Sequence, residues 1–502
     1  MAGIVYGFGS FQLDPTSRTL NQAGSSVALS ARQFDLLLLL VARAGQVLSK
    51  DALIDAAWAG VAVTDNSVEQ AVSALRRILN SREAGTYIET QARRGYRFGV
   101  DVQRVDRREP DEALDALLAP HRAWIEGRAA LETLERSQIL HAREVFERVL
   151  AQVPDQASAH VGLANAGVMQ CEMTRSELTP DTAALTLAAL HARDAFRLDP
   201  RYGEAWATLG FVLDRTGHRA DALAASRMAV SLEGDNWRHH VRLAYVSWGE
   251  ERLREASRTL SLLPGFPMAH WLAATVHVAR HALDDAEREL REGLAAQGVQ
   301  AHGRFTSVAL HWLLGLILLG RDDQDSALEQ FELELSAEGN GQLYARECCA
   351  NTWYAIGALR LQQHDSRAAV EAFEETLKRV PMHPLAHAAL LVLRSRGASH
   401  PDPTVSLGLS DEARDRFDLR SHLSGGTDAG ELRSGQPEMT LARAVTGVLG
   451  GNVPDAVTAI ETALDLASPG SALWLLPVEP LLRIGDDTRW SSVLARLRNR
   501  AA

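Results

Sequence analysis

The sequence predicts an α+β domain in the first part of the chain, followed by a longer all-α array of paired helices. Short β-type segments flank three helical segments before residue 104, and helical patterns with recurring small and large residues fill most of the chain after residue 120. Residues 1–108 carry 13 Lys and Arg against 10 Asp and Glu, whereas the whole chain has a net charge of −12. All 17 histidines follow residue 108, which marks the same boundary.

Short strands open the chain, separated by the turn signals Asp14-Pro15 and Ala23-Gly24. They are predicted over Tyr6–Asp14, Arg18–Asn21 and Ser26–Leu29. Two helices follow, one over Ala31–Arg43 after Ser30, and one over Lys50–Trp58 with Ser49 as its N-cap. We therefore expect a small antiparallel sheet followed by two helices.

The third predicted helix, Asn66–Asn80, has one apolar and one polar face. At about 100° per residue, its apolar stripe is Val68, Val72, Leu75 and Leu79. The opposite face carries Asn66, Gln70, Ser73 and Arg77, and the helix ends in Arg76-Arg77. A helix with one packed face and one polar, partly basic face suits the major groove of DNA.

A hairpin is predicted after this helix, with strands over Tyr87–Gln91 and Tyr96–Val100. Its connection, Ala92–Gly95, carries Arg93 and Arg94. Arginines at such a tip can reach backbone phosphates or the minor groove, where the negative potential is concentrated.

These elements together resemble the winged helix-turn-helix DNA-binding domain of OmpR/PhoB-type transcriptional regulators, including the CadC/HilA-like group. The resemblance spans residues 4–101. The stretches that carry it are Phe11-x-Leu-Asp-Pro15, Leu29-Ser-x-Arg-x-Phe-Asp-Leu-Leu-Leu-Leu39, Val47-Leu-Ser-Lys-Asp-x-Leu53, Trp58, Val63-Thr-Asp-Asn-Ser-Val68, Ala74-Leu-Arg-Arg77 and Tyr87-Ile-x-Thr-x-x-x-Arg-Gly-Tyr-Arg-Phe98.

The resemblance implies that the third helix enters the major groove, that the hairpin is a wing at the minor groove, and that the preceding loop contacts RNA polymerase. Together with the helix pattern, it assigns DNA binding to Asn66, Ser67, Gln70, Ser73, Arg76, Arg77, Arg93 and Arg94. The polymerase-contact loop would use Trp58, Val61, Val63 and Asp65. Ala71 and Ala74 stand where relatives often have polar or basic residues, so we expect few base contacts.

The rest of the chain repeats a spacing that resembles the 34-residue tetratricopeptide repeat. In that pattern, small residues let paired helices approach closely and large residues fill the remaining space. The clearest copies are Trp206-x-x-Leu-Gly210 with Ala222 and Ala229, His311-x-x-Leu-Gly315 with Ala327 and Phe331, and Trp353-x-x-Ile-Gly357 with Ala369, Phe373 and Pro381. Weaker copies lie near Trp124, Leu243, Ala273 and Ala456.

The predicted organisation therefore has five parts. They are a winged-helix domain over 1–103, a linker over 104–120, tetratricopeptide-like repeats over 121–397, a Gly-, Ser-, Asp- and Pro-rich insertion over 398–437, and C-terminal helical repeats over 438–502.

The sequence indicates no enzyme and no cofactor, because it lacks a Gly-rich phosphate loop, a dinucleotide fingerprint and a nucleophile elbow. His277 and His281, and also His383 and His387, are four residues apart and would share helix faces as metal ligands can. We favour structural histidines and expect no metal, since no H-E-x-x-H or clustered thiolates accompany them. Cys348-Cys349 could sense oxidants, but small-residue packing is the favoured interpretation.

We expect a cytoplasmic protein without a membrane anchor, since no apolar stretch approaches the roughly 20 residues of a spanning helix and no leader is evident. The leading hypothesis is a bacterial one-component transcriptional regulator that binds double-stranded promoter DNA as a homodimer, contacts RNA polymerase, and receives a protein, peptide or small effector at its repeats. One rival is a scaffold whose winged helix docks protein. The other is a metal-dependent enzyme that uses the paired histidines.

Overall fold

The structure is a computed structural model that describes residues 5–57, 65–79, 86–92, 94–104, 110–177, 179–299, 307–397, 437–467, 470–484 and 488–502. The chain divides into two compact units. The first comprises Met1–Gln170 and Ala183–His239, and the second comprises Cys171–Thr182 and His240–Ala502.

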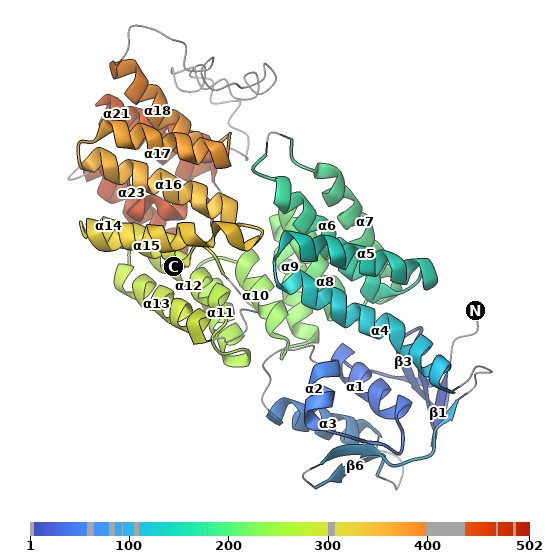
Figure 1. The fold of residues 1–502 in the computed structure, drawn as a ribbon. Coiled ribbons are helices and arrows are strands. Elements are labelled where there is room, and N and C mark those ends of the chain that lie inside the picture. The colour runs from blue at the N-terminus through green and yellow to red at the C-terminus, as the bar shows by residue number, and fades with distance from the viewer. Residues whose placement is uncertain are drawn as a thin grey trace. The chain divides into compact units, whose positions relative to one another are not determined.

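The first unit begins with two small sheets and three helices, drawn in blue in Figure 1. The elements are β1 (Tyr6–Phe8), β2 (Phe11–Asp14), β3 (Thr19–Gln22), β4 (Ser25–Val27), α1 (Ala31–Ala42), β5 (Val47–Leu48), α2 (Lys50–Ala57), α3 (Asp65–Leu79), β6 (Ile88–Gln91), β7 (Gly95–Phe98) and β8 (Gln103–Arg104). The strand orders are β4-β3-β2-β1-β8 and β5-β7-β6, with every pairing antiparallel. This confirms the predicted winged helix-turn-helix fold.

One predicted strand, Tyr6–Asp14, is in fact a hairpin. It turns at Gly9, whose φ of 55° is in the left-handed region that glycine tolerates, so that Phe8 pairs with Phe11. The two rings stack with centroids 5.7 Å apart. Phe98 meets Phe8 edge-on at 5.1 Å, and Tyr87 meets Phe11 at 5.6 Å. The hairpin therefore brings both sheets into one aromatic core.

Side-chain caps begin the first two helices, and the predicted N-cap Ser49 is confirmed. In α1, Ser30 and Gln33 form a capping box, in which the backbone N–H of Gln33 donates to Ser30 Oγ and the N–H of Ser30 donates to Gln33 Oε1. In α2, the backbone N–H of Ala52 donates to Ser49 Oγ at 3.1 Å.

Antiparallel helices make up most of the remaining chain (Figure 1). Their bounds are α4 (Pro110–Glu132), α5 (Arg136–Gln152), α6 (Ala157–Thr174), α7 (Thr182–Leu198), α8 (Gly203–Arg215), α9 (Arg219–Leu232), α10 (Trp237–Val246), α11 (Glu250–Leu262), α12 (Pro267–Ala279), α13 (Leu283–Val299), α14 (Leu310–Gly320), α15 (Gln324–Ser336), α16 (Ala345–Gln362), α17 (Ser366–Arg379), α18 (Pro384–Gly397), α21 (Pro437–Gly450), α22 (Val453–Leu466) and α23 (Thr488–Ala501). Two short 3₁₀ segments are η1 (Ala337–Asn340) and η2 (Ala472–Val478).

The repeat positions identified in the sequence do pack as the tetratricopeptide pattern requires. The small residues of the second helices are fully buried, namely Ala142, Ala222, Ala256, Ala286, Ala327 and Ala369. A Cβ added at Gly315 or Gly357 would collide with the ring of the phenylalanine in the paired helix, Phe331 or Phe373 respectively. Glycine is therefore what lets each helix pair close on its aromatic residue.

A second regularity ties three of the repeats to the end of the preceding one. The carbonyl of Pro200 accepts a hydrogen bond from Trp206 Nε1 at 2.8 Å, six residues later. The carbonyl of Pro381 is bonded in the same way to His387 Nε2 at 2.7 Å, and that of Pro154 to His160 Nε2 at 3.1 Å. These bonds satisfy a carbonyl at the turn between helices, where no backbone partner is available.

The proposed domain boundaries remain a prediction. Within the segment suggested as a linker, 104–120, the structure places the end of β8 and the beginning of α4 at Pro110. The suggested insertion over 398–437 lies outside the described residues except for Pro437, at which α21 begins.

Across the described ranges, no helix combines the length and the hydropathy that crossing a membrane would require.

Candidate nucleic-acid interface

Helix α3 presents the polar face that its sequence pattern predicts. Val68, Val72, Leu75 and Leu79 are at most 1% exposed and pack against the domain core. On the opposite side, Gln70, Ser73 and Arg77 are exposed. Asn66 and Ser67 belong to the first turn of α3, but their side chains lie outside the described residues. The helix is thus held by one face and accessible by the other.

Arg76 is placed differently from its neighbour Arg77. Its Nε donates to the carbonyl of Ile88 at 2.9 Å and its Nη2 to Thr90 Oγ1 at 2.8 Å, both on β6. Its guanidinium also lies 5.9 Å from the centroid of the Tyr96 ring. Arg76 therefore connects the recognition helix to the wing, a positioning role that the sequence pattern did not suggest.

The wing is the antiparallel pair β6–β7, in which Glu89 is opposite Arg97. These two side chains form an ion pair across the strands, with Arg97 Nη2 2.5 Å from Glu89 Oε2. Arg94, at the tip, is exposed and has no side-chain partner within the described part of the chain. Arg93 lies outside the described residues. Among the described residues, Arg94 therefore provides the positive charge at the tip of the wing.

Gly95 sets how closely the wing can approach the rest of the domain. Its φ is 124°, and a Cβ at this position would collide with the backbone of Leu48 and Ser49. Leu48 pairs with Tyr96 in the same three-stranded sheet. Glycine is required here both for the backbone conformation and for the contact with β5.

The loop expected to contact polymerase falls mostly outside the described residues. Trp58, Val61 and Val63 lie outside the described residues, and Asp65 is placed only as the first residue of α3.

Neither histidine pair lies wholly within one helix. Helix α12 ends at Ala279, and His281 lies beyond it with a φ of 58°. His383 precedes α18, where its Nδ1 accepts the backbone N–H of Ala386 at 3.2 Å and its Nε2 donates to Asn351 Oδ1 at 3.0 Å. Burial lowers the pKa of His383 to about 3, so it is a neutral helix cap.

The cysteine pair is buried in α16 rather than exposed to oxidants. Burial raises the pKa of the Cys348 thiol well above its usual value, and raises that of Cys349 to about 12. A thiol is reactive mainly as its thiolate, so these residues act as small packing residues.

One group in the described ranges does have the residue types of a metal site, namely His270, Glu289 and Glu292. His270 Nδ1 is 2.8 Å from Glu289 Oε2 and 4.0 Å from Glu292 Oε2. The shorter distance is that of a hydrogen-bonded ion pair between α12 and α13, which explains the cluster without an ion.

Comparison with known proteins is informative for the N-terminal domain. Residues 24–98 match the family model described as "Transcriptional regulatory protein, C terminal". The transcriptional activator CadC of Escherichia coli is 33% identical over 108 residues, which cover 21% of this chain and 21% of CadC. The transcriptional regulatory protein RstA of Escherichia coli is 37% identical over 96 residues, or 18% of this chain and 39% of RstA.

Among solved structures, the DNA-binding domain of Escherichia coli CadC is 33% identical, with 20% of this chain and 98% of that domain covered and a TM-score of 0.19. The chain spans about a fifth of the length of CadC, so the likeness concerns this domain alone. With the matching residues and the observed strands and helices taken together, the N-terminal domain belongs to the OmpR/PhoB-type family of DNA-binding transcriptional regulators, and a tetratricopeptide-like helical solenoid follows it.

Proposed function

We propose that this chain is a one-component transcriptional regulator that binds promoter DNA through its winged helix and is controlled by a partner or effector at its helical repeats. The observation that carries the proposal is the exposed polar face of α3, with Gln70, Ser73 and Arg77 free while the apolar stripe is buried. Such a face, on a domain of this family, suits direct contact with base edges and phosphates.

In the proposed complex, the α3 face that carries Asn66, Ser67, Gln70, Ser73 and Arg77 enters the major groove, and Arg93 and Arg94 of the wing approach the adjacent minor groove. Arg77 and Arg94 would neutralise phosphate charge, which makes the affinity depend on salt. Arg76 would act mainly by fixing the wing relative to α3, because two of its nitrogens already bond β6.

Further partners extend the proposal. The loop with Trp58, Val61, Val63 and Asp65 would contact RNA polymerase, and two chains would bind adjacent half-sites as a homodimer. Pairing raises affinity because the second domain binds at a high effective concentration. Binding to promoter DNA would place the chain in the cytoplasm, and the role that we propose there is non-enzymatic.

Buried polar contacts within the first unit support control of the winged helix by the repeats. Arg18 of the N-terminal domain pairs with Asp35 of α1 at 2.7 Å, and His121 of α4 lies 3.5 Å from the same carboxylate. Further along, Arg238 of α10 forms an ion pair with Glu132 of α4. A ligand that shifts α4 would therefore alter the contact of His121 with Asp35, and with it the position of the DNA-binding domain on the repeats of the first unit.

The test is fluorescence anisotropy of labelled genomic fragments with the full chain at several salt concentrations. We expect binding that weakens steeply with salt, and a loss of about tenfold in affinity for Arg77→Ala and again for Arg94→Ala. Arg148→Ala is the matched control, because Arg148 is an exposed arginine on α5, outside the winged helix. Equal, weak binding by wild type, both variants and the control would contradict the proposal.

That same outcome would favour the scaffold alternative. The specific observation in its favour is that α3 offers few base-reading side chains, since Ala71 and Ala74 lie on it and Arg76 is engaged by β6.

A further inference from the structure

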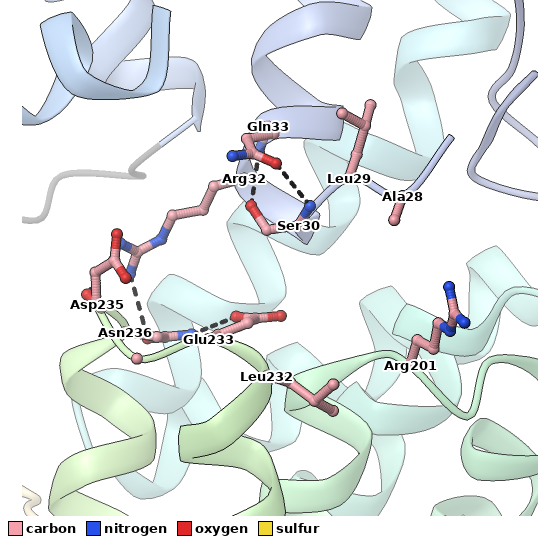
Figure 2. A pocket seen from close by; sticks show the side chains of 11 residues that line it. Ala28, Leu29, Ser30, Arg32, Gln33, Arg201, Leu232, Glu233, Asp235 and Asn236 are labelled. Atoms are coloured by element: carbon pink, nitrogen blue, oxygen red, sulfur yellow. Dashed lines mark hydrogen bonds between the residues drawn. The ribbon is translucent and has the colours of Figure 1, made fainter. Parts of the chain in front are cut away.

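A pocket in the first unit lies where the beginning of α1 meets two loops of the repeats. Its volume is about 500 Å³, within the usual range for small-molecule sites. Residues 28–30, 32 and 33 line it from the winged-helix domain, and residues 201 and 232–236 line it from the helical repeats. Figure 2 shows Arg32 extending from α1 toward the loop of Asp235 and Asn236, with Arg201 on the opposite side of the pocket.

Arg32 occupies an unusual position for a positively charged side chain. Arg32 is in the first turn of α1, where the helix dipole is positive and acidic residues are preferred. No acidic residue occupies that turn. Ser30 and Gln33, which flank Arg32, use their side chains on each other in the capping box, so neither compensates the charge.

The hydrogen-bond partners of Arg32 are neutral. Its Nη1 donates to the carbonyl of Asp235 at 3.4 Å and its Nη2 to Asn236 Oδ1 at 3.2 Å. The nearby carboxylate of Glu233 is already used, since it accepts from Asn236 Nδ2 at 3.0 Å and pairs with His239 Nε2 at 3.2 Å. Burial lowers the pKa of Arg32 below its ordinary value, and the attraction of Glu233 offsets this only in part.

Arg201 adds a second positive charge to the pocket. It lies in the loop before α8 and is exposed, and its side chain forms no hydrogen bond or ion pair with any part of the chain that the structure describes. The carboxylate of Asp199, in the same loop, accepts a hydrogen bond from the backbone N–H of Arg201. The pocket thus has one guanidinium from the winged-helix domain and one from the helical repeats, and neither is in direct contact with a carboxylate among the described residues.

We propose that this pocket is a binding site for a small anionic metabolite with a phosphate or carboxylate group, held by Arg32, Arg201 and the N-terminal end of α1. The anion would bridge the DNA-binding domain and the repeats, so its binding would restrict how the winged helix is oriented. Asp235, which is exposed at the rim, limits the charge that the pocket accepts and favours a ligand with one localised anionic group.

The inference rests on the proposed function for its regulatory consequence, but the site can be tested without DNA. The full chain is titrated with inorganic phosphate and, separately, with succinate, against sodium chloride of equal ionic strength, and binding is followed by calorimetry and thermal shift. We expect saturable binding of at least one of the two anions, and the stronger of them identifies the ligand group. No binding beyond that of chloride would overturn the proposal.

The informative variant is Arg201→Ala, because this exposed side chain forms no hydrogen bond or ion pair with the described residues. We expect it to weaken anion binding by about tenfold or more, as for loss of a charge-assisted hydrogen bond. The single variant Arg32→Ala should weaken anion binding more than Arg201→Ala does. Arg197→Ala is the matched control, because Arg197 is 70% exposed on α7 and does not line the pocket. Unchanged binding in Arg201→Ala and in Arg32→Ala would place the anion elsewhere and overturn the assignment.

Anisotropy with DNA then separates the two proposals. If the anion binds at Arg201 while DNA does not bind at all, the pocket stands and the regulator proposal fails. If DNA binds with the salt dependence described above and neither anion binds, the regulator stands and the pocket fails.

Discussion

Two helix ends in the N-terminal domain carry arginines in opposite electrostatic settings. Arg77 is in the last turn of α3, where the helix dipole favours a positive charge, and it is exposed. Arg32 is in the first turn of α1, where the dipole opposes it, and it bonds a loop about two hundred residues away in the sequence. The first arrangement is explained within one helix, whereas the second requires a distant partner.

The difference teaches that a free functional face can be recognised from local periodicity, while an interface between modules cannot. The apolar stripe of α3 predicts which side of that helix is covered, and so which side remains open. Nothing near Arg32 in the sequence identifies the loop of Asp235 and Asn236. A basic residue in a first helical turn without an acidic neighbour is nevertheless a usable signal of a tertiary partner.

The largest expected loss of stability is at the buried ion pair of Arg18 and Asp35, which lies next to His121 of α4. Asp35→Asn leaves the Arg18 guanidinium, whose side chain is 14% exposed, without its anionic partner. We expect a loss of about 4 kcal/mol in the free energy of unfolding of the first unit, measured by urea denaturation followed by circular dichroism.

The matched control for that variant is Glu89→Gln, which removes one partner of the Arg97–Glu89 pair, whose side chains are 40% and 34% exposed, and should cost less than about 1 kcal/mol. Equal losses in the two variants would contradict the idea that the repeat-facing contacts stabilise the domain more than those of the wing.

The next largest loss of stability is expected at Gly95, in the wing. Gly95→Ala introduces a Cβ at a φ of 124° and against the backbone of Leu48, so we expect a loss of about 3 kcal/mol and weak DNA binding. Gly24→Ala is the control, because its φ is 82° but the space around it is open, and it should cost only about 1 kcal/mol. Thermal unfolding of both variants measures the difference, and similar melting temperatures would show that the contact with Leu48 is unimportant.

A smaller effect distinguishes the two adjacent arginines of α3. Arg77→Ala should reduce the slope of log affinity against log salt by about one, because one phosphate contact is lost. Arg76→Ala should instead leave that slope unchanged and lower the domain's stability by about 1 kcal/mol, since it loses its bonds to Ile88 and Thr90. Identical salt slopes in the two variants would show that Arg76 also contacts DNA.

The smallest effect is expected at the surface pair between α2 and α3. Lys50 Nζ lies 2.7 Å from Glu69 Oε1, but the two side chains are 32% and 52% exposed. Glu69→Gln should therefore change the free energy of unfolding by no more than about 0.5 kcal/mol. A double-mutant cycle with Lys50→Met measures the coupling directly, and a value above 2 kcal/mol would make this pair comparable to the buried pair at Asp35, against our expectation.

Most of the fold was predictable because its signals are local. Ser30 and Ser49 cap the helices that they precede, and the small residues at Ala327 and Ala369 are buried in the helix pairs that the repeat spacing predicts. The turn at Gly9 was missed although the sequence carries a local signal for it. The apolar residues Tyr6 and Phe8 are at even positions, whereas Phe11 and Leu13 are at odd positions, and the change falls at Gly9-Ser10, where the hairpin turns so that Phe8 pairs with Phe11.

Parts of the site were not predictable for a physical reason. The engagement of Arg76 by the carbonyl of Ile88 depends on how the wing folds back on α3, which sequence spacing does not give. The sequence favoured structural histidines over metal ligands but did not show that α12 ends before His281 or that α18 begins after His383, because helix ends vary by a few residues.

The sequence by itself determined the two-part architecture, the amphipathic recognition helix and the repeat positions, because each depends on residues close together in the chain. Only the tertiary structure decided that Arg76 is turned toward the wing, that His387 bonds a proline carbonyl, and that Arg32 and Arg201 line one pocket. Those outcomes depend on how turns, strands and helices pack against one another, and local periodicity does not encode that geometry.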